Sequence, residues 1–215
     1  MKTIHYTTED KRTLEADLYD AGGDRWAILM HMMPATKSSY KKLAEALVKK
    51  GISCLAFDQR GHGESQGGPD AYKSFTDFEH VAKTMDVEAS IQYLLDEEFN
   101  EEKMILVGAS IGANLAIATA VGESKIPAVV ALSPGLDYRG IVVEDSLREL
   151  EEGQKFLIVA SKEDEYSALS AKRIHQSNDK QSKLIMKEGL GHGTAMLDAD
   201  DDLLEEVVRW IDKHV

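Results

Sequence analysis

One serine lies in a setting that suits a nucleophile. Ser110 stands where an apolar run leads into Gly-x-Ser-x-Gly and then directly into a helical pattern of small residues. A nucleophilic serine must project from a sharp turn, and glycines at positions 108 and 112 let the strand and the helix approach closely. The start of the helix adds backbone N–H groups and the positive end of its dipole. The segment therefore predicts a nucleophilic Ser110, with a small-residue turn without catalysis as the alternative.

The elements that would position this serine alternate along the chain, as in strand–helix–strand units around a parallel sheet. Near-continuous apolar runs predict strands that are covered on both faces, at 26–30, 52–57, 104–107, 128–132 and 156–160, with a weaker run at 183–186. Before them, alternating residues predict an antiparallel hairpin of 2–7 and 14–19. Helical spacing predicts helices around 40–48, 78–95, 113–120 and 204–211.

Bulk composition favours one globular domain over residues 1–215. Hydrophobic residues make up 43% of the chain and charged residues 29%, and the net charge is −13. An acidic surface repels phosphate backbones and anionic headgroups, so we expect neither nucleic acid nor a membrane as a partner. Cys54 is the single cysteine and lies in an apolar run, which predicts a buried thiol and excludes an internal disulfide.

Signals for export, membrane insertion and metal binding are also missing from the sequence. The first residues contain no apolar leader segment and no apolar run approaches 18 residues, so we expect a cytoplasmic location. The acidic segment 198–202 precedes the last helical pattern, where carboxylates favour the positive end of the helix dipole. We therefore read it as a helix cap, and we expect no metal site and no cofactor. The oligomeric state is not predicted.

Four segments together resemble the α/β-hydrolase superfamily, in that family's order. The segment 31–34, His-Met-Met-Pro, stands where the family usually has His-Gly-x-Pro, and 57–65 resembles its Asp-x-Arg-Gly-His-Gly-x-Ser loop. The turn at Ser110 is the third, and Gly191-His192-Gly193 is the fourth. The resemblance covers nearly the whole chain. It implies an α/β fold with a mostly parallel central sheet, an N-terminal antiparallel hairpin and helices on both faces.

The resemblance implies a catalytic triad in the chain order serine, acid, histidine. It assigns Ser110 as the nucleophile, Asp164 as the orienting acid and His192 as the general base. Glu163, next to Asp164, and Asp137, after the preceding strand, are rival acids. The mechanism would be hydrolysis through an acyl-enzyme on Ser110.

The resemblance further implies an oxyanion hole made by the backbone N–H groups of Ile111 and Met33. Met32 stands where the family usually has glycine, so its backbone could be strained or could shift the Met33 N–H group. His62 is expected to shape the floor of the site. The residues expected to contact substrate are His31, Met32 and Met196.

Only residues 133–154 separate two predicted strands where many relatives carry a lid, so no separate cap domain is expected. An open site fits a small-molecule substrate such as a carboxylic ester, a thioester or an amide. Two alternatives from other classes stay open. The fold could serve as a non-catalytic small-molecule receptor, or it could hydrolyse a carbon–carbon bond.

Overall fold

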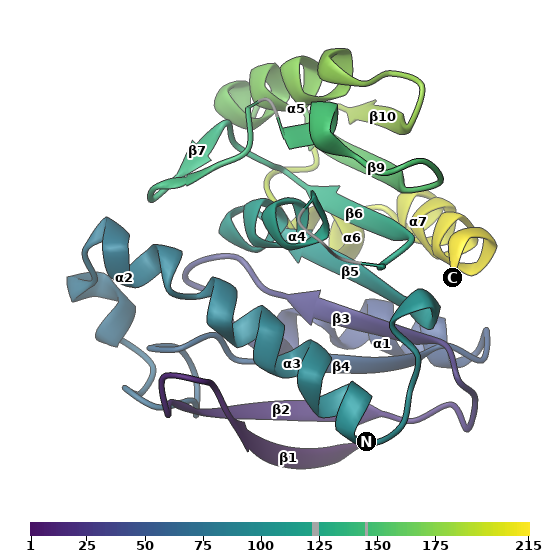
Figure 1. Cartoon of the computed structure of the whole chain (residues 1–215). Coiled ribbons are helices and arrows are strands. Elements are labelled where there is room, and N and C mark those ends of the chain that lie inside the picture. Colours follow the sequence, from purple (N-terminus) through teal and green to yellow (C-terminus); the bar gives the residue numbers. More distant parts are fainter. Residues whose placement is uncertain (122–124, 145) are drawn as a thin grey trace.

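A central eight-stranded sheet organises the computed structural model, which describes residues 1–121, 125–144 and 146–215 (Figure 1). Its strand order is β1-β2-β4-β3-β5-β6-β9-β10, and a separate hairpin pairs β7 with β8. The strands are β1 (Lys2–Thr7), β2 (Thr13–Tyr19), β3 (Trp26–Met30), β4 (Ser53–Phe57), β5 (Met104–Ala109), β6 (Ala128–Leu132), β7 (Asp137–Tyr138), β8 (Ile141–Val142), β9 (Lys155–Ser161) and β10 (Ser182–Lys187).

The pairing directions confirm the fold class expected from the sequence. β1 pairs with β2, and β2 with β4, in antiparallel fashion, whereas all the pairs from β4 through β3, β5, β6 and β9 to β10 are parallel. All residues of β3, β4, β5 and β6 are buried, which explains their nearly continuous apolar sequences. Because the strands are parallel, their carboxyl ends meet at one edge of the sheet.

Helices cover both faces of the sheet (Figure 1). Helices α3, α4 and α5 pack on one face and α1, α6 and α7 on the other. Their bounds are α1 (Lys41–Val48), α2 (Asp77–Val81), α3 (Thr84–Asp96), α4 (Ile111–Val121), α5 (Glu165–Ser177), α6 (Ala195–Ala199) and α7 (Asp201–His214), with short 3₁₀ helices at η1 (Lys37–Tyr40), η2 (Ala71–Ser74), η3 (Glu101–Lys103) and η4 (Ser146–Glu149). The expected acidic cap is present, since the Asp200 side chain accepts from the Leu203 N–H at 2.9 Å.

One predicted helix is wrong in its extent, and one helix was not predicted. The single helix expected around 78–95 is divided into α2 and α3, and Phe78 is 82% exposed instead of facing the core. Thr76 starts α2 with a capping box in which Glu79 takes part, a local signal that the apolar spacing did not reveal. Helix α5 was not predicted, because it buries mainly small residues and Ile174 and so has no strong apolar stripe.

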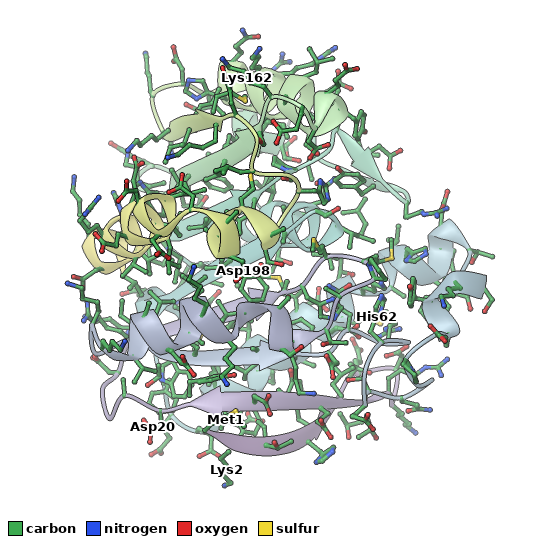
Figure 2. The ribbon with its side chains drawn as sticks, turned by 180° about the vertical axis from the view of Figure 1, so that it is seen from behind. Met1, Lys2, Asp20, His62, Lys162 and Asp198 are labelled. Atoms are coloured by element: carbon green, nitrogen blue, oxygen red, sulfur yellow. The ribbon has the colours of Figure 1, made fainter. Side chains whose placement is uncertain are left out.

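The view from behind shows the extent of the sheet: the labels of Lys2, in the edge strand β1, and Lys162, after β9, lie at opposite ends (Figure 2). Cys54 is completely buried in β4, as predicted, and burial raises the pKa of its thiol. In the part of the chain that the structure describes, no helix combines the length and apolar character needed to cross a membrane.

Candidate active site

Ser110 lies in a strained turn between β5 and α4. Its φ angle is +54°, in the left-handed region that residues with a side chain rarely adopt. A Cβ atom added to Gly108 would lie 1.9 Å from the Gly112 carbonyl oxygen, and one added to Gly112 would lie 2.2 Å from the Met30 oxygen. Both glycines are therefore required by close backbone contact. This geometry matches the strand–turn–helix arrangement predicted for a nucleophilic serine.

His192 is paired with Asp164, because its Nδ1 lies 2.5 Å from the Asp164 Oδ2 atom. A carboxylate only accepts hydrogen bonds, so Nδ1 carries a proton and Nε2 of the neutral ring is left as an acceptor. The loop of His192 lies beside the serine turn. A Cβ atom added to Gly193 would be 3.4 Å from the Cβ atom of Ala109, the residue before Ser110. The structure thus brings the three predicted triad segments to one edge of the sheet.

The two rival acids have other partners. Glu163 accepts from the N–H groups of Gly191, at 2.7 Å, and Gly189, at 2.8 Å. A hydrogen bond from Ser161 and these backbone donors lower the pKa of Glu163 to about 2. Asp137 accepts from the Gly140 N–H inside the β7–β8 turn. Glu163 therefore anchors the loop that carries His192, and Asp137 stabilises a hairpin.

A second anchor holds the other side of the His192 loop. The Gly193 N–H donates to the Ser133 Oγ atom at 2.9 Å. Ser133 follows β6 and has a φ angle of +51°, so this anchor comes from a strand end separate from that of Glu163. The imidazole thus stands between two fixed backbone positions.

The loop after β3 holds the residues expected to contact substrate and oxyanion. His31 is completely buried, with Nδ1 2.9 Å from the Met32 carbonyl oxygen and Nε2 accepting from the Gln59 N–H at 3.0 Å. Burial lowers its pKa to about 3, so it is neutral at physiological pH. Met32 is not among the residues with positive φ, so the lack of a glycine causes no strain of that kind. Its Sδ atom lies 2.5 Å from a Cβ atom added to Gly193.

Met196 and the backbone donors complete the predicted set. Met196 is completely buried, with its Sδ atom 4.0 Å from the Ser133 Oγ atom. The Ile111 N–H stands at the start of α4, where helical N–H groups lack partners within the helix. Met33 follows β3, the strand next to β5. Contact of these groups with substrate or an oxyanion stays a prediction.

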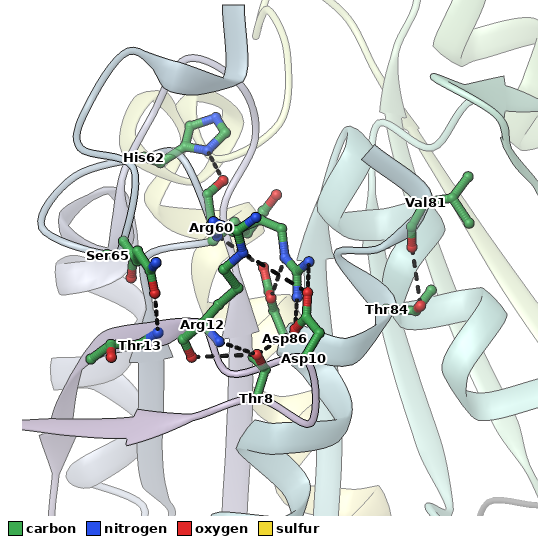
Figure 3. Close-up of polar contacts among 12 residues, drawn as sticks. Thr8, Asp10, Arg12, Thr13, Arg60, His62, Ser65, Val81, Thr84 and Asp86 are labelled. Carbon is green, nitrogen blue, oxygen red and sulfur yellow. Dashed lines mark hydrogen bonds and ion pairs between the residues drawn. The ribbon is translucent and has the colours of Figure 1, made fainter. Parts of the chain in front are cut away.

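Ion pairs and hydrogen bonds hold the loop after β4 in place (Figure 3). The Arg60 Nε and N atoms donate to the two carboxylate oxygens of Asp86 at 2.8 and 2.9 Å, and its terminal nitrogens donate to both oxygens of Asp10 at 2.7 and 2.9 Å. His62 is buried, stacks on Tyr72 and has its Nδ1 3.2 Å from the Arg60 oxygen. Burial lowers the pKa of His62 to about 2, which supports the structural role expected for it.

The sequence analysis missed a buried lysine next to Met33. Lys83 is completely buried, and its Nζ atom donates to the Met33 Sδ atom at 3.8 Å, a weak acceptor. Burial lowers its pKa to about 7. His80, near the end of α2, is also buried, at 2% exposed. Neither position has a periodic signal, since both lie beside the break that divides the expected long helix into α2 and α3.

Replacing Lys83 with methionine is expected to stabilise the protein most at neutral pH. Between pH 7 and the ordinary lysine pKa of about 10.4, the unfolded chain binds a proton that folded Lys83 does not. The destabilising effect of buried Lys83 therefore becomes smaller as pH rises through this window, and the wild-type free energy of unfolding increases. Lys83→Met should add about 1–4 kcal/mol at pH 7 and less at pH 10, measured by urea unfolding.

The exposed Lys41 supplies the control for this experiment, because Lys41→Met changes the same side chain without burial. Its effect on unfolding should be small and equal at the two pH values. A Lys83→Met protein that is destabilised equally at both pH values would contradict the prediction.

Within the residues that the structure describes, no cluster of three or more histidine, cysteine, aspartate or glutamate side chains could hold a metal ion.

Comparison with known proteins identifies the family of the chain. A family model described as serine aminopeptidase, S33 (Hydrolase_4) matches residues 24–188, which include β3, the Ser110 turn and Asp164. The chain belongs to this family of α/β hydrolases. Among curated relatives, the polyketide transferase grgF of a Penicillium species is 28% identical over 140 residues, 64% of this chain and 46% of that protein. The quorum-quenching protein AidA of Acinetobacter baumannii is 30% identical over 95 residues, 44% of this chain and 30% of that protein.

Solved structures resemble the hydrolase over nearly its full length. An esterase of Pyrococcus furiosus superposes with a TM-score of 0.82 at 20% identity, covering 99% of this chain and 92% of that one. An esterase of Exiguobacterium antarcticum gives 0.76 at 15% identity, covering 98% and 99%. These likenesses show a shared fold. The chain spans less than half the length of the two curated relatives.

Proposed function

We propose that this hydrolase cleaves small carboxylic esters through an acyl-enzyme on Ser110, with His192 as general base and Asp164 as orienting acid. The observation that carries the proposal is the 2.5 Å contact between His192 Nδ1 and Asp164 Oδ2, on a loop that packs against the strained Ser110 turn. The esterases among the structural neighbours support the same chemistry. Thioesters and amides present the same acyl carbon and are further candidate substrates.

In the proposed mechanism, the Ser110 oxygen attacks the acyl carbon while its proton moves to His192 Nε2. Asp164 holds the Nδ1 proton and stabilises the cation that forms. The N–H groups of Ile111 and Met33 would bind the negative oxygen, each contributing about 3 kcal/mol in the transition state. His192 then returns its proton to the leaving alkoxide. In the second step, water attacks the acyl carbon while His192 takes its proton, and that proton then passes to the departing Ser110 oxygen.

Ester hydrolysis by the wild type and by variants of Asp164 and Glu163 tests this proposal. The purified wild type is expected to hydrolyse p-nitrophenyl butyrate at neutral pH and to bind one equivalent of a fluorophosphonate at Ser110. Asp164→Asn should lower kcat about 10⁴-fold, because the amide no longer fixes the reactive tautomer of His192. Glu163→Gln should lower kcat less than about tenfold, because its amide oxygen still accepts from the loop.

Two other outcomes would contradict these assignments. A larger loss for Glu163→Gln than for Asp164→Asn would assign the orienting role to Glu163. A wild type that neither turns over esters nor reacts with the fluorophosphonate would reject the proposed function and favour a non-catalytic receptor.

A further inference from the structure

Tyr138, in the β7–β8 hairpin after β6, lies beside the nucleophile and has no role in the mechanism above. Its phenol lies 2.8 Å from the Ser167 Oγ atom on α5, and the Ser110 side chain is near enough to lower its pKa against the larger effect of burial. The phenol is therefore close to both a serine of α5 and the reacting serine.

The hairpin that carries Tyr138 is fixed to the helix that follows the nucleophile. Asn114, in the first turn of α4, donates to the Ile141 carbonyl oxygen at 2.8 Å and accepts from the Gly135 N–H at 3.1 Å. A Cβ atom added to Gly135 would lie 2.7 Å from the Tyr138 ring, so the ring packs directly on the backbone. Tyr138 is thus held relative to Ser110 by contacts with α4 itself.

Tyr166 supports the hairpin from the other side. Its hydroxyl donates to the Asp137 carbonyl oxygen at 2.9 Å and accepts from the Asp137 N–H at 3.1 Å. The rings of Tyr138 and Tyr166 meet edge to face at 5.6 Å. Tyr166 therefore positions the hairpin next to Tyr138.

The proton inventory makes Tyr138 a donor toward Ser110. Burial raises the pKa of Tyr138, so its phenol stays protonated at neutral pH. Ser110 has one hydroxyl proton, which must point to His192 for attack to occur. The 2.8 Å bond between Tyr138 and Ser167 can run in either direction. When the Ser167 hydroxyl donates to Tyr138 rather than to the Ser133 carbonyl oxygen 3.4 Å away, the Tyr138 proton is available to the reacting side.

The strand order sets the side from which Tyr138 approaches. β3 and β6 flank β5 on opposite sides, and the Tyr138 hydroxyl contacts Ser167 of α5, which follows β9 beyond β6. Tyr138 therefore approaches Ser110 from the side away from Met33, which follows β3. If Met33 binds the carbonyl oxygen, Tyr138 faces the other oxygen of the ester. That oxygen gains negative charge as the carbon–oxygen bond breaks, where a hydrogen-bond donor helps most.

We propose that Tyr138 is a further catalytic residue, which donates a hydrogen bond to the leaving-group oxygen of the ester. The proposal rests on the proposed function of Ser110. Tyr138 transfers no proton, because His192 supplies the proton that the leaving alkoxide takes up. Its hydrogen bond matters most for alkyl esters, whose alkoxides are poor leaving groups, and least for p-nitrophenyl esters, whose phenolate carries the charge unaided.

The experiment compares kcat/KM for ethyl acetate and p-nitrophenyl acetate in the wild type and in Tyr138→Phe. Loss of a hydrogen bond to a charged oxygen should lower kcat/KM about 10- to 100-fold for ethyl acetate and less than about threefold for p-nitrophenyl acetate. Tyr93→Phe, which removes a tyrosine hydroxyl on α3 and away from the β7–β8 hairpin, should change the two esters by equal factors. Ser167→Ala should shift the ratio in the direction of Tyr138→Phe, by a smaller factor.

Equal losses for both esters in Tyr138→Phe would overturn the proposal and leave Tyr138 a structural role. Thermal unfolding of each variant shows whether the fold is retained, and a change in the ratio between esters survives a partial loss of folded protein. Hydrolysis that depends on Ser110 but not selectively on Tyr138 rejects this inference alone. Absence of all ester hydrolysis in the wild type rejects the proposed function, and this inference with it.

Discussion

Ser110→Ala is expected to lower kcat for p-nitrophenyl butyrate about 10⁵- to 10⁶-fold. Nucleophile, base and acid act as a unit, so removing the attacking oxygen abolishes the acyl-enzyme pathway and leaves only binding and oxyanion contacts. The fold should be retained, because alanine keeps the Cβ atom that the φ angle of +54° already accommodates. Steady-state rates at saturating ester, together with loss of fluorophosphonate labelling, measure the effect.

Ser53 offers a matched control for this change. It is completely buried at the amino end of β4, where its Oγ atom accepts from the Ala21 N–H. Ser53→Ala removes a buried serine hydroxyl at the opposite end of a parallel strand, and it should cost stability without a comparable loss of kcat. Retention of more than about one per cent of wild-type kcat by Ser110→Ala would show that another group is the nucleophile.

Asp86→Asn is expected to lower the free energy of unfolding by about 3–5 kcal/mol at pH 7. Asp86 is completely buried and binds both the backbone and the side chain of Arg60, which is 5% exposed (Figure 3). An amide keeps the shape of the side chain but removes the charge, which leaves the guanidinium group poorly compensated. Urea unfolding followed by circular dichroism gives the difference.

Asp10→Asn is the control, because Asp10 binds the same guanidinium group through its outer nitrogens. The Asp10 side chain is 34% exposed, so water can replace its contact, and the expected loss is about 1 kcal/mol or less. A loss for Asp86→Asn no larger than that for Asp10→Asn would show that burial does not control this ion pair.

The sequence predicted best where local pattern and tertiary role coincide. The runs of β3, β4, β5 and β6 are almost wholly apolar because both faces are covered, and the fold class is confirmed. The turn at Ser110 could be predicted because close backbone contact excludes side chains at positions 108 and 112. The order of motifs along the chain also predicted the pairing of His192 with Asp164, which the structure brings into contact.

The parts that were not predicted depend on long-range packing. Lys83 lies between α2 and α3 and is buried with its Nζ atom against Met33 in the loop after β3, and no periodic pattern marks such a position. Tyr138 reaches Ser110 through a two-residue strand pair, which is too short to produce an alternation of polar and apolar residues. Asn114, which binds the hairpin of Tyr138, gave no sequence signal beyond being one polar residue among the small and apolar residues of α4.

The two anchors of the His192 loop have a consequence for pH–rate measurements. One anchor is the Glu163 carboxylate, with a pKa of about 2, and the other is the Ser133 hydroxyl, which does not ionise in water. Neither group changes its protonation state between about pH 4 and pH 9. The hydrogen bonds that hold the His192 loop are therefore unaffected by pH over this range. Release of the His192 loop through protonation of Glu163 therefore does not contribute to a loss of activity between about pH 4 and pH 9.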